Sequence, residues 1–306
     1  MQVEDVDGVL VVDKPAGPTS HDIVNRARRV FRLRRIGHTG TLDPFATGVL
    51  PLCLGRATRL ARFLGDGDKV YRATVQAGFA TSTDDLTGTP LSEPGAPQLE
   101  TEQVRVALER FVGIHDQLPP AYSARRVAGR RMYEMARRGE EVPRTPRAVT
   151  IHAIELVGVE SDRIEIEVRC SPGTYIRSLA RDLGEALGTG AHLAALRRTR
   201  SGAFVLEQAV PGDDLAAGRD RLVPLADTLP QLPAVRVGND GRDLVRHGRP
   251  VPKESVLDGF PEEPFERVRI LDESGALLAL AVRHGSETGG APPVETTLHP
   301  DVVLVA

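Results

Sequence analysis

The sequence predicts an α+β protein with about two domains. Residues Arg163–Cys170 alternate apolar and charged side chains, which is typical of a strand with one buried and one wet face. Tyr175–Leu187 instead gathers its apolar residues on one side of a helix. The length of 306 residues suits two domains, and the proline-rich segment Pro224–Pro233 predicts a linker. We therefore expect a larger domain over residues 1–230 and a small β-rich domain over residues 231–306.

The first half is predicted to alternate short strands and helices. A helix begins at Thr19 or Ser20, because a hydroxyl side chain caps a helix N-terminus and Asp22 then lies where the helix dipole favours an acid. Apolar runs and turn residues predict the remaining elements. These are strands at Gly8–Val12, Val49–Leu54 and Val70–Phe79, and helices at Arg56–Leu64 and Thr101–Val112.

The second half contains an insertion of different character. Gln117–Pro146 is rich in arginine, proline and glycine, so we predict a mobile, basic insertion that carries a short helix over Gly129–Gly139. After the helix at Tyr175–Leu187, a second short helix is predicted to contain His192 and Leu196. Strand-like pieces then follow the linker, at Ala234–Val237, Arg267–Leu271, Leu277–Val282 and Val302–Val305.

The segment Gly37–Gly48 organises the candidate site. Its three glycines and one proline predict a shaped loop, and its only acid is Asp43. An Asp-Pro pair often forms a turn in which the carboxylate bonds to backbone amides. The same geometry can present the carboxylate as a nucleophile or general base, and the residues alone leave both interpretations open. A two-carboxylate glycosidase using Asp43 with Asp84 or Asp85 also stays open, although arginine-rich flanks are unusual for a neutral sugar substrate.

Positive charge is concentrated in two runs, although the net charge is only -3. Residues 26–35 hold six arginines and no acid, and residues 121–147 hold eight arginines against three glutamates. Residues 231–306 offset this with twelve acidic and eight basic side chains. A charge run is usually a solvated face, but two runs beside a candidate catalytic loop also fit a polyanionic partner.

Several protein classes are excluded by spacing. The chain lacks a P-loop, and Gly37–Gly40 is too short for a dinucleotide fingerprint. A zinc nucleobase deaminase needs a Pro-Cys-x-x-Cys pair, whereas Cys53 and Cys170 stand far apart, which also argues against a disulfide framework. No run approaches eighteen apolar residues and the start is acidic, so we expect a cytoplasmic protein without membrane association.

Three motifs in register closely resemble the TruB family of pseudouridine synthases. They are Lys14-Pro15-x-Gly17-x-Thr19-Ser20, Gly37-His38-Thr39-Gly40-Thr41-Leu42-Asp43-Pro44-x-Ala46-Thr47-Gly48, and Gly173-Thr174-Tyr175-Ile176-Arg177-Ser178-Leu179-x-x-Asp182-Leu183-Gly184. The resemblance implies a catalytic domain with a mixed, mainly antiparallel sheet flanked by helices, a thumb insertion over about 117–146, and a PUA-like RNA-binding domain at the C-terminus. It also implies isomerisation of uridine 55 in the T-arm stem-loop of tRNA, without cofactor, metal or obligate protein partner, by a monomer.

The resemblance further implies roles for individual residues. Asp43 matches the family nucleophile, which attacks either the uracil ring or the ribose, and Arg177 matches the arginine that pairs with it and keeps it ionised. From the residues alone, a surface pairing of Arg177 with Asp182 or Glu185 is equally reasonable. Tyr71 matches a tyrosine that lies against the flipped uracil and is also a candidate general base. Asp85 matches an acid that supports the arginine.

Further matches concern substrate binding. His38 matches a histidine that occupies the space left by the uridine, and Tyr175 and Leu196 match residues that line the uracil pocket. Without the resemblance, Leu196 reads as an ordinary core leucine. In the thumb insertion, Arg126 stands where relatives usually have lysine. A tRNA-folding chaperone that uses the same cleft, and a synthase acting on another RNA, remain the alternatives.

Overall fold

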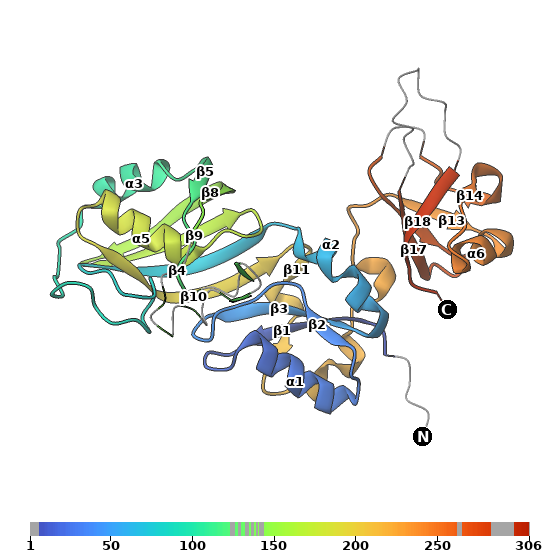
Figure 1. The fold of residues 1–306 in the computed structure, drawn as a ribbon, viewed down its shortest axis with the longest axis horizontal. Helices are drawn as coiled ribbons and strands as arrows, with labels where there is room; N and C mark the ends of the chain where they lie inside the picture. The colour runs from blue at the N-terminus through green and yellow to red at the C-terminus, as the bar shows by residue number, and fades with distance from the viewer. Residues whose placement is uncertain are drawn as a thin grey trace, which may run out of the picture.

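The structure, a computed structural model, describes residues 6–122, 126–127, 130–131, 135, 138, 140, 144–261, 265–282 and 297–305. These residues form an elongated molecule, with a large sheet running from one end through the middle and a second sheet at the other end (Figure 1). Within them, no helix has the length and apolar character needed to cross a membrane.

Ten strands of the described residues form the large sheet. They are β1 (Gly8–Lys14), β2 (Ile36–His38), β3 (Thr47–Leu54), β4 (Lys69–Ala77), β5 (Gly113–Gln117), β8 (Arg147–Glu160), β9 (Arg163–Cys170), β10 (Ala191–Ser201), β11 (Phe204–Val205) and β12 (Val210–Pro211). The order is β12-β1-β3-β10-β4-β9-β8-β5, with β2 beside β3 and β11 beside β10. Only the β1–β12 and β3–β10 pairs are parallel among these described pairings. The predicted mixed, mainly antiparallel sheet is therefore confirmed.

One face of this sheet is covered by helices α1 (Ser20–Phe31), α3 (Thr101–Glu109) and α5 (Ile176–Ala186). Helix α2 (Ala61–Gly65) lies on the opposite face, where Leu64 clusters with Val9 and Val11 of β1. Helix α5 packs on β10 and β4, and α3 packs on β8 and α5 (Figure 1). In β9, Ile164, Ile166 and Val168 are buried against this layer, whereas the alternate charged residues face the other side. The alternation predicted for this strand is confirmed.

The C-terminal residues form a second sheet of six strands within the described ranges, in the order β14-β18-β17-β16-β13-β15. Its strands are β13 (Ala234–Val237), β14 (Val251–Pro252), β15 (Val256–Asp258), β16 (Val268–Leu271), β17 (Leu277–Val282) and β18 (Thr297–Val303). The small β-rich, PUA-like domain is confirmed, but it also contains a helix that we do not predict, α6 (Asn239–Arg246).

The two sheets share a packed junction. Leu60, just before α2, and Leu64, within it, lie in one apolar cluster with Leu280 and Leu304 of the C-terminal part. Leu229 belongs to the same cluster and is 2% exposed. The proline-rich segment predicted as a linker thus contributes apolar side chains to the junction, while its prolines are exposed.

Three predicted helices differ in the structure. His192 and Leu196 lie in strand β10, and the prediction of a helix there is wrong, because this segment pairs with both β3 and β4 at the centre of the sheet. The helix predicted at Arg56–Leu64 is divided into a 3₁₀ turn, Gly55–Leu60, and α2. In the insertion, β6 (Arg126–Val127) pairs with β7 (Arg130–Arg131), and the rest of the helix predicted at Gly129–Gly139 lies largely outside the described residues.

Candidate active site

Asp43 lies in the loop between β2 and β3, next to the N-terminus of α1. The Ser20 hydroxyl joins the helix to this loop, since it accepts a hydrogen bond from the Leu42 amide at 2.8 Å and donates one to the Leu42 carbonyl at 3.1 Å. From β1, Lys14 Nζ donates to the Pro44 carbonyl at 3.1 Å. The backbone is therefore held on both sides of Asp43, which presents its carboxylate in a defined position.

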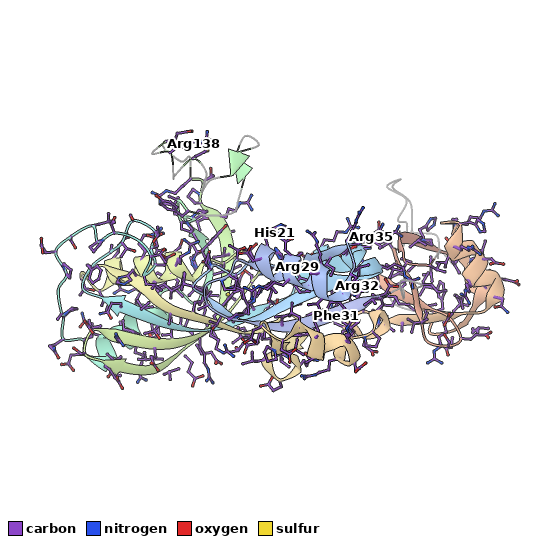
Figure 2. All side chains as sticks on the ribbon, turned by 90° about the horizontal axis from the view of Figure 1, so that it is seen from below. His21, Arg29, Phe31, Arg32, Arg35 and Arg138 are labelled. Carbon is purple, nitrogen blue, oxygen red and sulfur yellow. The ribbon has the colours of Figure 1, made fainter. Side chains whose placement is uncertain are left out.

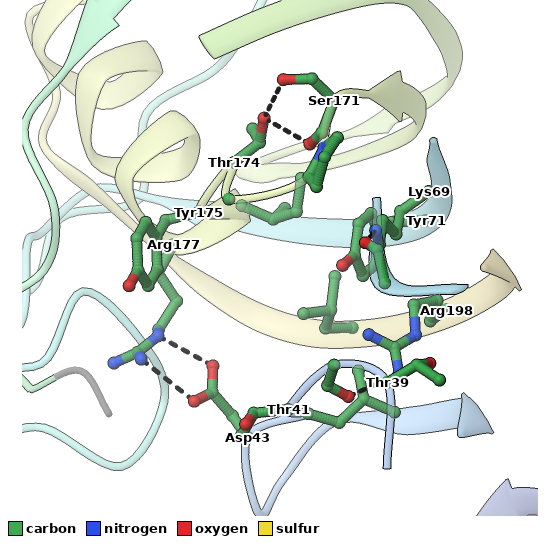
Figure 3. Close-up of a pocket in the computed structure, with 17 residues that line it drawn as sticks. Thr39, Thr41, Asp43, Lys69, Tyr71, Ser171, Thr174, Tyr175, Arg177 and Arg198 are labelled. Carbon is green, nitrogen blue, oxygen red and sulfur yellow. Dashed lines mark hydrogen bonds and ion pairs between the residues drawn. The ribbon is translucent and has the colours of Figure 1, made fainter. Parts of the chain in front are cut away.

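Arg177, in the first turn of α5, faces this carboxylate (Figure 3). Its Nη2 donates to Asp43 Oδ1 at 3.0 Å, and its Nε lies 3.0 Å from Oδ2. Arg177 is 4% exposed, whereas the Asp43 side chain keeps 32% exposure. The guanidinium thus fixes the carboxylate from behind and leaves it accessible in front. Asp182 instead accepts a hydrogen bond from Arg181, at 2.7 Å.

A second carboxylate, Asp85, holds the far side of the guanidinium. Its Oδ2 lies 3.3 Å from Arg177 Nη1. Its Oδ1 accepts hydrogen bonds from the hydroxyl of Thr83 at 2.7 Å and from the amide and hydroxyl of Thr87 at 2.9 and 2.6 Å. Asp85 is itself buried, so the Asp43–Arg177–Asp85 series is anchored in the core at one end.

A cavity of about 300 Å³ opens beside the Asp43–Arg177 pair. The residues singled out from the sequence that line it are Asp43, Tyr71, Tyr175, Arg177 and Leu196 (Figure 3). They come from the loop before β3, from β4, from the start of α5 and from β10. His38, on β2, does not line the cavity, and its Nδ1 is buried with no hydrogen-bond partner in the described part of the chain.

Comparison with known proteins identifies the family. The model described as "TruB family pseudouridylate synthase (N terminal domain)" matches residues 28–176, and "tRNA pseudouridylate synthase B C-terminal domain" matches residues 177–222. The protein named tRNA pseudouridine synthase B of Solibacter usitatus (strain Ellin6076) is 42% identical, over 98% of this chain and 100% of its own length. The chain belongs to the TruB family of pseudouridine synthases.

Other members and solved structures are similar over much of the chain. The tRNA pseudouridine synthase B of Gloeobacter violaceus (strain ATCC 29082 / PCC 7421) is 54% identical, over 70% of this chain and 74% of that protein. A chain in the crystal structure of a Cbf5-Nop10-Gar1 complex is 26% identical, with a TM-score of 0.75, covering 100% of this chain and 86% of that one. The structural similarity to that chain therefore includes the C-terminal sheet of this TruB-family protein as well as the large sheet.

The surroundings of Asp43 shift the pKa of its carboxyl group in opposite directions. Burial raises the pKa of the Asp43 carboxyl above its ordinary value, and the negative charge of Asp85 adds to the rise. The Arg177 guanidinium lowers the pKa by stabilising the carboxylate, but the net direction is upward. The expectation that Arg177 keeps the acid ionised therefore describes only one of the contributions, and the loss of this guanidinium would raise the pKa further.

The TruB-family chain offers little other reactive chemistry in its described residues. Burial raises the pKa of the Cys53 thiol to about 12 and that of Cys170 to about 11, and both cysteines are free. Because the thiolate is the reactive form, both side chains are inert near neutral pH. Within the described residues, no group of three or more His, Cys, Asp or Glu side chains is arranged to hold a metal ion.

Sequence reasoning missed two cations that line the cavity. Lys69 is 6% exposed and donates to the carbonyls of Gly65 and Gly67, so it closes one end of the cavity. Arg198 is 1% exposed and is the largest fully buried side chain of the described residues. Its signal was available: in a strand, Arg198 shares a face with Leu196, two residues earlier. The helix prediction for this segment hid that relation.

A group of unpaired arginines lies at the C-terminal end of α1 and just after it. Arg29, Arg32, Arg34 and Arg35, which we call the α1 ridge, are exposed, and their side chains have no hydrogen bond or ion pair among the described residues. In Figure 2, Arg35 lies near the upper edge of the molecule, beyond which Arg138 lies, and Arg29 and Arg32 lie closer to the middle of the view. Exposed guanidinium groups without acidic partners are suited to phosphates.

Proposed function

We propose that this TruB-family protein isomerises uridine 55 in the T arm of tRNA to pseudouridine. The observation that carries the proposal is a single carboxylate, Asp43, clamped by a buried arginine at the edge of a cavity lined by Tyr71, Tyr175 and Leu196. The relatives' name, tRNA pseudouridine synthase B, supports tRNA as the substrate. We further propose that residues 1–230 form the catalytic domain and residues 231–306 an RNA-binding domain.

Asp43 acts as the nucleophile, and Arg177 orients it. Whether Asp43 adds to the uracil ring or attacks the ribose, the bond between C1′ and N1 breaks and a bond between C1′ and C5 forms. The proton on C5 is lost and N1 gains one, so no atom is added overall and the reaction is an isomerisation. A nucleophile of this kind must be ionised, so the Arg177 contact that favours the carboxylate supports the first step.

The remaining site residues receive the base. Uridine 55 must leave its stacked position to reach Asp43, which costs a few kcal/mol. Tyr71 and Leu196, which are 9% and 8% exposed, form an apolar wall for the uracil, with Tyr175 beside them. His38 lies on the adjacent strand β2, outside the cavity, a position from which it can occupy the place that the base vacates.

Contacts to RNA phosphates supply the binding energy that moves uridine 55 out of its stack. The α1 ridge and the arginines of the thumb insertion, residues 117–146, bind the RNA backbone, and recognition follows the shape of the stem-loop. Helix α1 runs from the Asp43 loop, which it contacts through Ser20 and Leu42, to the α1 ridge at its other end, so a stem that extends from the cavity along α1 reaches the ridge. We propose that the protein acts as a cytoplasmic monomer without an obligate protein partner.

The decisive experiment measures pseudouridine in an unmodified T-arm stem-loop treated with wild-type protein and with Asp43→Asn. We expect the variant to lose turnover while binding the stem-loop, because only the nucleophile is altered. Asp116→Asn is the matched control, since Asp116 is an exposed aspartate on the edge strand β5. Pseudouridine formation by Asp43→Asn at the wild-type rate would refute the mechanism.

The same variant separates catalysis from a role in tRNA folding. If Asp43→Asn accelerates refolding of full-length tRNA as well as the wild type does, the binding surface performs that role independently of turnover. If wild-type protein leaves uridine 55 unchanged but modifies other uridines in cellular RNA, the RNA target proposed here is wrong and the chemistry remains.

A further inference from the structure

Arg198 occupies a central position in the sheet beside the candidate site. In β10 it lies directly opposite Tyr71 of the antiparallel strand β4 and beside Gly48 of the parallel strand β3. Side chains at directly opposed positions share a face, and both Arg198 and Tyr71 line the cavity (Figure 3). The positive charge of Arg198 lies close enough to the Tyr71 phenol to lower its pKa, against the rise that burial causes.

The guanidinium of Arg198 is held by backbone carbonyls on both sides of the nucleophile loop. Its Nε donates to Val49 O at 2.7 Å, and its Nη2 donates to Gly40 O at 3.1 Å. Val49 follows the loop and Gly40 precedes Asp43, so one side chain spans the segment that carries the nucleophile. Through these contacts Arg198 holds the Asp43 loop at both ends.

Arg198 differs from Arg177 in its charge balance. Arg177 faces two carboxylates, Asp43 and Asp85, whereas no carboxylate among the described residues forms an ion pair with Arg198. A buried charge is usually paired, because its removal from water is costly. The cavity therefore has a positive wall beside the Asp43 loop, and no carboxylate of the described residues neutralises it (Figure 3).

The proposed isomerisation creates a negative charge that fits this wall. When the C1′–N1 bond breaks, its electron pair stays on the uracil and spreads over N1 and the two carbonyl oxygens. If Asp43 instead adds to the ring first, the resulting enolate also places negative charge on a carbonyl oxygen. Both routes make the base transiently anionic, and preorganised positive charge lowers the barrier to such a state.

We propose that Arg198 is a positioning residue that holds the Tyr71 hydroxyl towards the uracil and stabilises the negative charge on the base as the glycosidic bond breaks. This inference rests on the proposed function. In the proposed arrangement Arg198 donates to Tyr71 Oη, so the Tyr71 O–H is directed away from Arg198 and donates to a uracil carbonyl. Burial raises the pKa of the Tyr71 phenol, so the hydroxyl keeps the proton that it donates.

The test compares three variants in single-turnover reactions on a T-arm stem-loop. Arg198→Met removes the charge and keeps the length, Arg198→Lys keeps the charge and loses the fork, and Arg197→Met is the matched control. Arg197 is the next residue along β10 and bonds Asp13 with its partly exposed side chain. We expect Arg198→Met to slow the chemical step by about 100- to 1,000-fold with stem-loop affinity unchanged. Arg198→Lys should recover part of the rate, and Arg197→Met should retain the wild-type rate.

A second substrate separates electrostatic assistance from a purely structural role. Fluorine at C5 withdraws electrons, so 5-fluorouracil is a better leaving group and needs less stabilisation. We expect the Arg198 variants to lose less rate on a 5-fluorouridine stem-loop than on the uridine stem-loop, measured as conversion to the C-glycoside. Arg198→Lys, which keeps a buried cation, gives this comparison if Arg198→Met does not fold.

Three results would overturn the inference. One is a wild-type rate for Arg198→Met, another is an equal loss on both stem-loops, and the third is loss of stem-loop binding in both variants together with lowered thermal stability. The last two would assign Arg198 to support of the Asp43 loop alone. Failure of the proposed function is distinguishable, because wild-type protein would then form no pseudouridine in the uridine stem-loop.

Discussion

Substitution of Arg177 by methionine tests the electrostatic arrangement around Asp43. The variant removes a guanidinium that faces both carboxylate oxygens at 3.0 Å. A hydrogen bond between charged groups typically contributes about 1.5–3 kcal/mol, which corresponds to a loss of about 10- to 150-fold in rate. The 32% exposure of the Asp43 side chain favours the lower part of this range, because water screens the pair.

The pH dependence of the rate tests the role of Arg177 more directly than the size of the rate loss does. Arg177 lowers the pKa of Asp43, so its removal raises that pKa and leaves less carboxylate at a given pH. The acid limb of the single-turnover rate should therefore move to higher pH in Arg177→Met. Asp85 raises the pKa of Asp43, so Asp85→Asn should move the same limb to lower pH. The assay is pseudouridine formation in the T-arm stem-loop across the acidic range.

Folding is the control for this experiment. Arg177→Met leaves Asp85 buried without its cation, and an uncompensated buried charge is destabilising by about 3–5 kcal/mol. The double variant Arg177→Met with Asp85→Asn removes that charge, so its thermal stability should exceed that of Arg177→Met alone. An acid limb that stays in place in Arg177→Met, in a folded protein, would refute the assignment of Asp43 as the ionised group in the rate.

Two further predictions concern RNA binding and the sheet. If about six phosphates are contacted, wild-type affinity for the T arm should fall about a thousandfold between 50 and 200 mM salt, and replacing Arg29, Arg32 and Arg35 together by glutamine should reduce the slope of log K against log salt by about two to three units. A flat wild-type titration, or an unchanged slope, would reject this footprint. Gly48→Ala should lower the free energy of unfolding by more than about 1 kcal/mol in a urea titration, because Gly48 has φ +103° and a Cβ there would overlap the backbone of Arg198. Unchanged urea unfolding would contradict the close approach of β3 and β10 at that point.

Local patterns predicted most elements because their signals lie within a few residues. The alternation in Arg163–Cys170 gave strand β9, and the Thr19–Asp22 pair gave the start of α1, where the structure has a capping box. The segment around Leu196 was predicted wrongly because its apolar residues fit either period, and only pairing with β3 and β4 decides between them. Tertiary contacts overrode the local preference.

The site shows the same division. The loop motif singled out Asp43, and the resemblance named Arg177 as its partner, but local sequence could equally pair Arg177 with Asp182. The two partners are 134 residues apart, and folding decides which acid a guanidinium meets. Residue type alone did not separate Arg198 from its neighbour Arg197, which is chemically identical and bonds Asp13 instead. Successive side chains of a strand point to opposite faces, so Arg197 and Arg198 can be told apart only once this segment is known to be a strand.

The sequence by itself determined the kind of chemistry and the family of this protein, because residue types and their spacing are properties of the chain. The tertiary structure decided which charges are paired and which are buried alone. That difference is physical: the pKa of Asp43 and the unpaired charge of Arg198 depend on desolvation and on neighbours from distant segments, which exist only after the sheet, α5 and the Asp43 loop have come together.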